Sequence, residues 1–148
     1  MVPPGAVLGP GQIHDINRFT LAAVVESHGC VAVPLTVAGD SLEALERAVD
    51  DARGCDLLVF SGGSSVGDRD LVLDVLASRG VVHFHGIATR PGKPTAFGAI
   101  GDVPVFGMPG NPSSCLTNAY VLLVPFLRRM ARLPAFHPGK KQVCRHAS

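Results

Sequence analysis

Apolar residues recur at helical spacing in several separate stretches of the chain. This spacing predicts helices over residues 15–28, 40–52 and 71–78, and Gly29 ends the first of them. A longer stretch, residues 113–130, is apolar on most faces and predicts a last helix that packs inside the protein. The chain therefore contains enough amphipathic helix to cover a sheet.

Shorter apolar runs lie between these helices and predict strands. The run at 57–60 is continuously apolar and is followed by glycines, which is typical of a central parallel strand buried on both faces. The last two runs flank Gly101-Asp102, a two-residue hairpin signal. Strands that alternate with helices predict an α/β fold with a mostly parallel sheet. The five predicted strands cover residues 31–35, 57–60, 81–87, 95–99 and 103–108.

The composition fits one globular domain. The chain has 148 residues, of which 47% are hydrophobic and 17% charged, so it can bury a core. We expect a linker over residues 1–12, the domain over 13–132 and a tail over 133–148. The net charge of +1 argues against nucleic acid and membrane surfaces as partners. The most apolar run, 119–127, is too short to span a bilayer.

The four cysteines are Cys30, Cys55, Cys115 and Cys144. None lies at metal-knuckle spacing from another, and no secretory signal precedes them. We expect reduced thiols in a cytoplasmic protein. Cys30 and Cys55 lie beside predicted strands and are interpreted as small core residues.

Three unusual loops lie where strands end, and open α/β sheets bind ligands at such ends. The first, SGGSSVGDRD at 61–70, has paired glycines that bring N–H groups close to a ligand, and it leads into a helix N-terminus that favours anions. A solvated turn is the alternative interpretation of this loop. The candidate ligand-binding residues here are Ser61, Gly62, Gly63, Ser64, Ser65 and Gly67.

The second loop, residues 90–94, holds two cations on a stiff Pro-Gly turn, an arrangement that can clamp a phosphate or another oxyanion. Its candidate ligand-binding residues are Arg90, Gly92 and Lys93. The third loop leads into a helix start, and each of these two loops could instead be a rigid turn with an N-cap. The candidates in the third loop are Pro109, Gly110, Asn111, Pro112 and Ser113.

In this order the motifs SGGSSVGDRD, RPGKPTAFG and GMPGNPSS resemble the MoeA family, which includes the C-terminal enzyme of gephyrin. Residues 10–17, PGQIHDIN, are similar to the start of the family's molybdopterin-binding domain. The resemblance covers residues 5–131. It implies a three-layer α/β/α domain of the fold shared with MogA.

The resemblance also implies a reaction. MoeA proteins take adenylylated molybdopterin and molybdate, release AMP and leave molybdenum on the dithiolene, with a divalent cation such as Mg²⁺ assisting. Asp70 and Asp40 match acidic positions of the family and are candidate catalytic and metal-binding residues. Each could instead be a helix cap, and Asp40 with Glu43 resembles a capping pair.

The chain departs from the family at some positions. Gly86 stands where many members carry Lys, which puts molybdate binding in more doubt than pterin binding. His83 and His85 share one face of a predicted strand, but two ligands are weak evidence for a metal, and ordinary partly buried histidines are favoured.

Family proteins have further domains and act as oligomers. We expect a homo-oligomer, a dimer or a trimer. The chain belongs either to a molybdenumtransferase or to a binding module without activity of its own, and a scaffold role ranks last.

Overall fold

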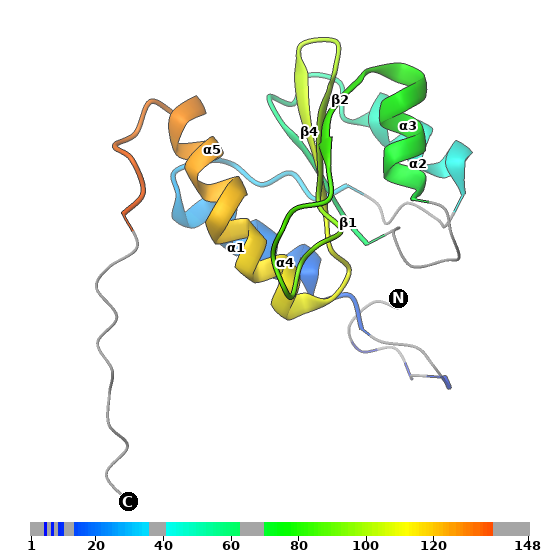
Figure 1. Cartoon of the computed structure of the whole chain (residues 1–148), viewed down its shortest axis with the longest axis horizontal. Coiled ribbons are helices and arrows are strands. Elements are labelled where there is room, and N and C mark those ends of the chain that lie inside the picture. The colour runs from blue at the N-terminus through cyan, green and yellow to red at the C-terminus, as the bar shows by residue number, and fades with distance from the viewer. Residues whose placement is uncertain are drawn as a thin grey trace, which may run out of the picture.

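A computed structural model describes residues 14–35, 41–62 and 70–137, together with residues 5, 7, 9 and 10. A central sheet carries helices on both faces (Figure 1), so the three-layer α/β/α architecture is confirmed. The strand at 103–108 contributes side chains to a hydrophobic core on each face of the sheet. Val105 faces one helical layer, and Phe106 and Met108 face the other. The layer around Phe106 contains α1 (Asn17–Ser27), α4 (Pro112–Asn118), η1 (Ala119–Leu123) and α5 (Val124–Met130). The layer around Val105 contains α2 (Leu42–Asp51) and α3 (Leu71–Arg79).

The sheet of the described residues is mixed. Its four strands are β1 (Leu58–Ser61), β2 (Val81–His85), β3 (Ala96–Ile100) and β4 (Val103–Met108). They lie in the order β1-β4-β3-β2, with β1 parallel to β4 and the other two pairs antiparallel.

The α/β class is confirmed, but the expectation of a mostly parallel sheet is wrong for these strands. The Gly101-Asp102 turn makes β3 and β4 a hairpin, as predicted. The connection from β2 to β3, residues 86–95, is too short for the crossover helix that a parallel pair needs. The strand at 58–61 is parallel as predicted, but it is an edge strand rather than a central one.

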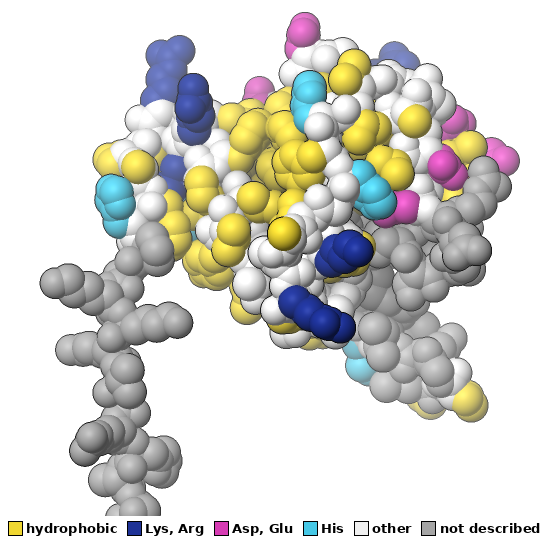
Figure 2. All heavy atoms as spheres, viewed as in Figure 1, with side chains coloured by type: hydrophobic (Ala, Val, Ile, Leu, Met, Phe, Trp, Pro, Cys, Tyr) yellow, Lys and Arg dark blue, Asp and Glu magenta, His cyan; other side chains and the backbone are white. Residues whose placement is uncertain are grey.

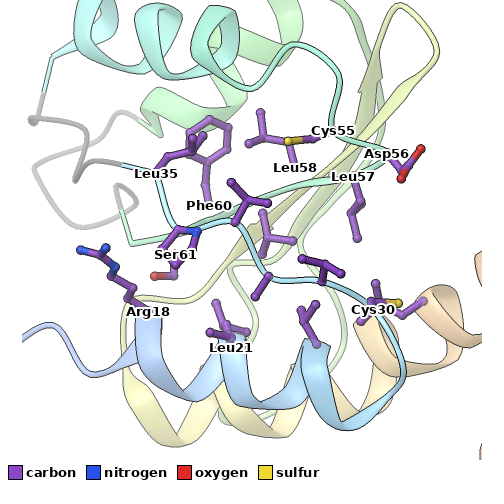
Figure 3. A pocket seen from close by; sticks show the side chains of 18 of the residues that line it. Arg18, Leu21, Cys30, Leu35, Cys55, Asp56, Leu57, Leu58, Phe60 and Ser61 are labelled. Atoms are coloured by element: carbon purple, nitrogen blue, oxygen red, sulfur yellow. The ribbon is translucent and has the colours of Figure 1, made fainter.

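The predicted strand at 31–35 is not formed. This segment runs alongside β1 (Figure 3), but it makes no ladder with β1. Pro34 has no N–H to donate to a ladder, and residues Val31 and Val33 are 86% and 62% exposed. The apolar composition of this segment therefore favours a strand, but its backbone lacks one of the N–H donors that pairing with a neighbouring strand needs.

The predicted helices are confirmed with small shifts at their ends. Ser41 caps α2, because its side chain accepts a hydrogen bond from Ala44 N at 3.2 Å, so the interpretation of Asp40 as the cap is wrong. The last helical stretch runs from Pro112 to Met130 with a π-helical turn in its middle. Pro125, which has no N–H, follows that wider turn. Among the described residues, none of the helices is long and apolar enough to cross a membrane.

Candidate functional site

The described residues of three loops lie at one edge of the sheet. β1 is parallel to β4, and β2 and β4 are both antiparallel to β3, so β1, β2 and β4 end at the same edge. We name three segments beside these strand ends the Gly-rich loop (61–70, which begins with the last residue of β1), the basic loop (90–94, within the β2–β3 connection) and the Pro-Gly-Asn-Pro loop (109–112). Their predicted placement at strand ends is confirmed. Of the Gly-rich loop only Ser61, Gly62 and Asp70 are described, and the candidates Gly63, Ser64, Ser65 and Gly67 lie outside the described residues.

The Gly-rich loop and the Pro-Gly-Asn-Pro loop touch through glycines. A Cβ built on Gly110 would lie only 3.3 Å from the Cα of Gly62, so the two backbones approach because neither residue has a side chain. Gly62 has a φ of +87°, and its N–H donates to the carbonyl oxygen of Met108 at 3.1 Å. Asn17, at the start of α1, donates from Nδ2 to the carbonyl oxygen of Gly110 at 2.9 Å. Three separate segments of the chain are thereby joined.

The Pro-Gly-Asn-Pro loop ends in a capped helix. The Oδ1 atom of Asn111 accepts hydrogen bonds from the backbone N–H groups of Ser113 and Ser114, at 3.1 and 3.2 Å. The hydroxyl of Ser113 also donates to this oxygen, at 2.8 Å. The N-cap interpretation of this loop is therefore confirmed, with Pro112 in the first turn of the helix. Pro109 is buried, whereas Ser113 is exposed at the edge.

The basic loop presents two exposed cations, Arg90 and Lys93. Figure 2 shows basic side chains gathered over the connection between β2 and β3. Neither cation forms an ion pair with another described residue. The loop backbone is well tied, because the carbonyl oxygen of Lys93 accepts hydrogen bonds from the N–H groups of Ile87 and Thr95, at 3.0 and 2.9 Å. Two positive charges are thus available to an anion.

Asp70 stands between a helix and a histidine. Its Oδ1 atom accepts hydrogen bonds from the N–H groups of Val72 and Leu73, at 3.1 and 3.2 Å, so Asp70 is the N-cap of α3. Its Oδ2 atom lies 3.6 Å from Nε2 of His85, at the end of β2. The Gly-rich loop and the segment before the basic loop therefore meet at this pair.

The described part of the chain contains no group of three or more His, Cys, Asp or Glu side chains that could hold a metal ion. The other candidate metal ligand, Asp40, lies outside the described residues. His83 does not join the pair at Asp70, because its ring stacks near Phe97, with the ring centroids 5.5 Å apart. Both histidines are exposed rather than partly buried as predicted.

Three buried polar residues near the site were not named as candidates, namely Asn17, Thr95 and Asn118, although the first two lie within the quoted family motifs. Each is at most 1% exposed. Asn118 donates from Nδ2 to the carbonyl oxygen of Gly92 and to Oγ1 of Thr95. The signal that could have revealed Asn118 is a lone amide in a mainly apolar helical stretch, since a buried amide requires partners.

A cavity of about 890 Å³ lies beside β1, between α1 and residues 29–35 (Figure 3). Its walls are mainly apolar, and it reaches Ser61 and Gly62 of the Gly-rich loop. Cys30 and Cys55 line it and are half-buried, so they are less enclosed than the predicted core residues. Cys115 is fully buried on α4, where burial, with a smaller contribution from the charge of Asp15, raises the pKa of its thiol to about 12. All three are free thiols, as predicted.

Comparisons with known proteins identify similar sequences and structures. The family described as "probable molybdopterin binding domain" matches residues 3–129. A molybdopterin molybdenumtransferase of Haemophilus influenzae is 39% identical over 131 residues, covering 88% of this chain and 32% of the relative. A molybdopterin molybdenumtransferase 2 of Mycobacterium tuberculosis is 36% identical, and the alignment covers 97% of this chain and 37% of the relative. Gephyrin of Dictyostelium discoideum is 32% identical and covers 81% of this chain.

A solved structure is also similar. The MoeA molybdopterin biosynthesis protein of Pyrococcus horikoshii superposes with a TM-score of 0.76 at 45% identity, covering 86% of this chain and 32% of that one. The chain spans about a third of the length of these transferases and of this MoeA protein.

Proposed function

This chain belongs to the family of probable molybdopterin binding domains and so to molybdenum cofactor biosynthesis, and we propose that it holds adenylylated molybdopterin across its three loops. The observation that carries the proposal is that the three loops follow strands that end at one edge of the sheet, an edge that therefore carries touching glycine backbones, a capped helix start and two exposed cations. Each of these features favours an anion. A pterin phosphate joined to a nucleotide is a ligand of matching chemistry.

We further propose that the chain is the pterin-binding part of a molybdopterin molybdenumtransferase, which consumes molybdate and releases AMP. In this proposal Arg90 and Lys93 hold the phosphates, and the glycine N–H groups of the Gly-rich loop approach them. Ser113 contributes its hydroxyl at the helix start. The same proposal includes a cytoplasmic location and a homo-oligomer, a dimer or a trimer. A binding module without activity of its own remains the alternative.

We propose that Asp70 would help to hold magnesium at this site. Mg²⁺ is commonly held by one or two carboxylates together with substrate phosphates and water. Asp70 supplies one carboxylate at the edge, and its Oδ2 atom is not used by the helix cap. Asp40 is proposed as the second. When bound there, Mg²⁺ would polarise the phosphoanhydride of the nucleotide. The protein's own part is to orient the phosphates and to place this carboxylate beside them.

A binding measurement tests the proposal. The purified chain is titrated with adenylylated molybdopterin by calorimetry, first as wild type and then as Arg90→Ala and Lys93→Ala. Loss of one charged contact is worth about 1.5–3 kcal/mol, so each variant should bind about tenfold to a hundredfold more weakly. Arg129→Ala, which removes an exposed cation on α5, is the matched control and should bind like the wild type.

Two results would contradict the proposal. One is a folded wild-type chain that does not bind the nucleotide. The other is binding that both loop variants leave unchanged, because the ligand would then lie elsewhere on the surface. Adding molybdate and Mg²⁺ and assaying AMP release separates a transferase from a binding module.

A further inference from the structure

A closed set of hydrogen bonds lies beneath the basic loop. Asn118 of α4 donates from Nδ2 to the carbonyl oxygen of Gly92 at 2.8 Å and to Oγ1 of Thr95 at 2.7 Å. The hydroxyl of Thr95 in turn donates to the same Gly92 oxygen at 3.0 Å. Asn118 and Thr95 are both fully buried. One carbonyl of the loop is therefore held by two buried donors.

This arrangement is unusual for a core position. Asn118 lies in a helix whose other buried residues in the same core are mainly apolar, including Cys115, Ala119 and Leu123. Burying an amide is unfavourable unless it is hydrogen-bonded, and an apolar side chain would avoid that requirement. Its Oδ1 atom has no partner among the described residues, so the amide is not optimised for stability alone. An asparagine at position 118 is better explained by the hydrogen bonds that its Nδ2 atom donates to the Gly92 carbonyl oxygen and to Thr95.

The loop packs directly onto this amide. Gly92 has a φ of +114°, and a Cβ built on it would lie 2.6 Å from Nδ2 of Asn118. Glycine is therefore required here by conformation and by space. Gly92 also stands between the two cations, Arg90 and Lys93. Hydrogen bonds to its carbonyl oxygen therefore restrain the stretch of backbone that carries both charged side chains.

The same helix links two loops. Asn111, the N-cap of α4, belongs to the Pro-Gly-Asn-Pro loop, and Asn118 lies two turns further along that helical stretch. In Figure 1 the connection between β2 and β3 lies against α4. The position of the basic loop relative to Ser113 is therefore set through one rigid element, which lowers the ordering needed when a ligand binds both loops.

We propose that Asn118 and Thr95 are positioning residues that hold Arg90 and Lys93 in their ligand-binding arrangement through the carbonyl oxygen of Gly92. This inference deepens the proposed function and rests on it. Neither residue reaches the ligand, because both are buried beneath the loop. Their effect on affinity passes through the two cations.

The closing experiment uses a matched series on the whole chain. Thr95→Val removes the hydroxyl at nearly constant volume, Thr95→Ser retains it, and Asn118→Asp replaces the donating amide nitrogen with an oxygen. Thr20→Val is the control, because its hydroxyl also donates to a backbone carbonyl at 3.0 Å but lies on α1. Affinity for adenylylated molybdopterin is measured well below each variant's thermal midpoint, so that every sample is fully folded.

We expect Thr95→Val and Asn118→Asp to weaken binding by about threefold to thirtyfold, and Thr95→Ser and Thr20→Val to bind within about twofold of the wild type. In an Arg90→Ala/Lys93→Ala background, Thr95→Val should cause no further loss, because the residues act through those cations. A merely structural role would lower the thermal midpoint without this dependence on the cations. If Asn118→Asp fails to fold, the Thr95 series alone decides.

Two outcomes would overturn the inference while leaving the proposed function intact. The first is a wild-type chain that binds the nucleotide while Thr95→Val binds it equally well. The second is an equal loss from Thr95→Val with and without the two cations. A folded wild-type chain that does not bind overturns the proposed function, and the positioning role with it.

Discussion

Asp70 illustrates how one side chain can serve both stability and chemistry. The cap of α3 uses only its Oδ1 atom, whereas Oδ2 faces His85 at the edge where the loops meet. The sequence offered the cap and the metal ligand as alternatives. The cap is observed. The metal role is a proposal, supported by the Oδ2 atom that the cap does not use.

The substitution Asp70→Asn separates the two roles. Asn caps a helix nearly as well as Asp, so the thermal midpoint should barely move. If the carboxylate holds Mg²⁺, the nucleotide affinity of the variant should no longer increase when Mg²⁺ is added. AMP release by a protein that carries this domain should fall about a hundredfold or more. Binding without Mg²⁺ should persist, because Lys93 and the glycine N–H groups remain.

Asp70→Ala is the companion variant, which loses the cap as well and should lose about 1 kcal/mol of stability. An Asn variant that responds to Mg²⁺ and turns over like the wild type would show that Asp70 is only a cap. An Asn variant that unfolds would show a structural role instead.

Sequence patterns pointed to exposed loop residues rather than to buried ones. Arg90, Lys93 and Asn111 were proposed because charge and Pro-Gly motifs are visible in the sequence. Thr95 and Asn118 were missed, because their importance depends on which distant backbone carbonyl they meet. Asn118 lies 26 positions from Gly92, so a local sequence pattern does not predict their contact.

At the scale of elements, helices were predicted more reliably than strand pairing. The positions of α1, α2 and α3 follow from apolar spacing and end signals, which are local. Strand pairing depends on partners far along the chain. The run at 31–35 had the composition of a strand, but the ladder it needed did not form. The short β2–β3 connection made a mixed sheet where a mostly parallel one was expected.

Close packing between elements makes Gly98 of β3 a sharp test of the fold. A Cβ there would collide with the carbonyl oxygen of Val81 and lie 2.9 Å from Cδ2 of Leu76, so both β2 and α3 oppose it. Gly98→Ala should destabilise the protein by about 1–3 kcal/mol, measured by urea unfolding.

The matched control is Gly101→Asn in the β3–β4 turn. Apart from its chain neighbours, no described residue has an atom within 4 Å of a Cβ there, and Asn tolerates the φ of +58°. Its free energy of unfolding should stay within about 0.5 kcal/mol of the wild type. Equal stability of Gly98→Ala and the wild type would show that β2, β3 and α3 are packed less closely than described.

At the scale of the whole molecule, the architecture brings distant motifs to one edge, as the positions of the loops after predicted strands had indicated. The pattern of helices and strands indicated α/β, but it could not state which strands neighbour one another. The order β1-β4-β3-β2 places the start of the Gly-rich loop beside the Pro-Gly-Asn-Pro loop, although 47 positions separate Ser61 from Met108 at the ends of their strands. Apolar residues that remain exposed on the folded molecule bear on whether it associates with other copies.

The last helical stretch predicts self-association. Leu123, Val124 and Leu127 are buried as expected, but Leu116, Tyr120 and Val121 are 39%, 41% and 54% exposed. Their spacing places these three on one side of the helix, where they form an apolar surface. We expect the chain to be a dimer or a trimer by sedimentation equilibrium, with this surface at the interface.

A charge placed on this surface should weaken the assembly. Tyr120→Glu would bury a carboxylate against apolar side chains of the neighbouring copy, so the variant should dissociate at concentrations where the wild type is assembled. Arg47→Glu, an exposed change on α2 across the sheet, is the control and should leave the mass unchanged. A wild-type chain that stays monomeric as its concentration rises would contradict the prediction. An assembly that Tyr120→Glu leaves intact would place the interface on another face.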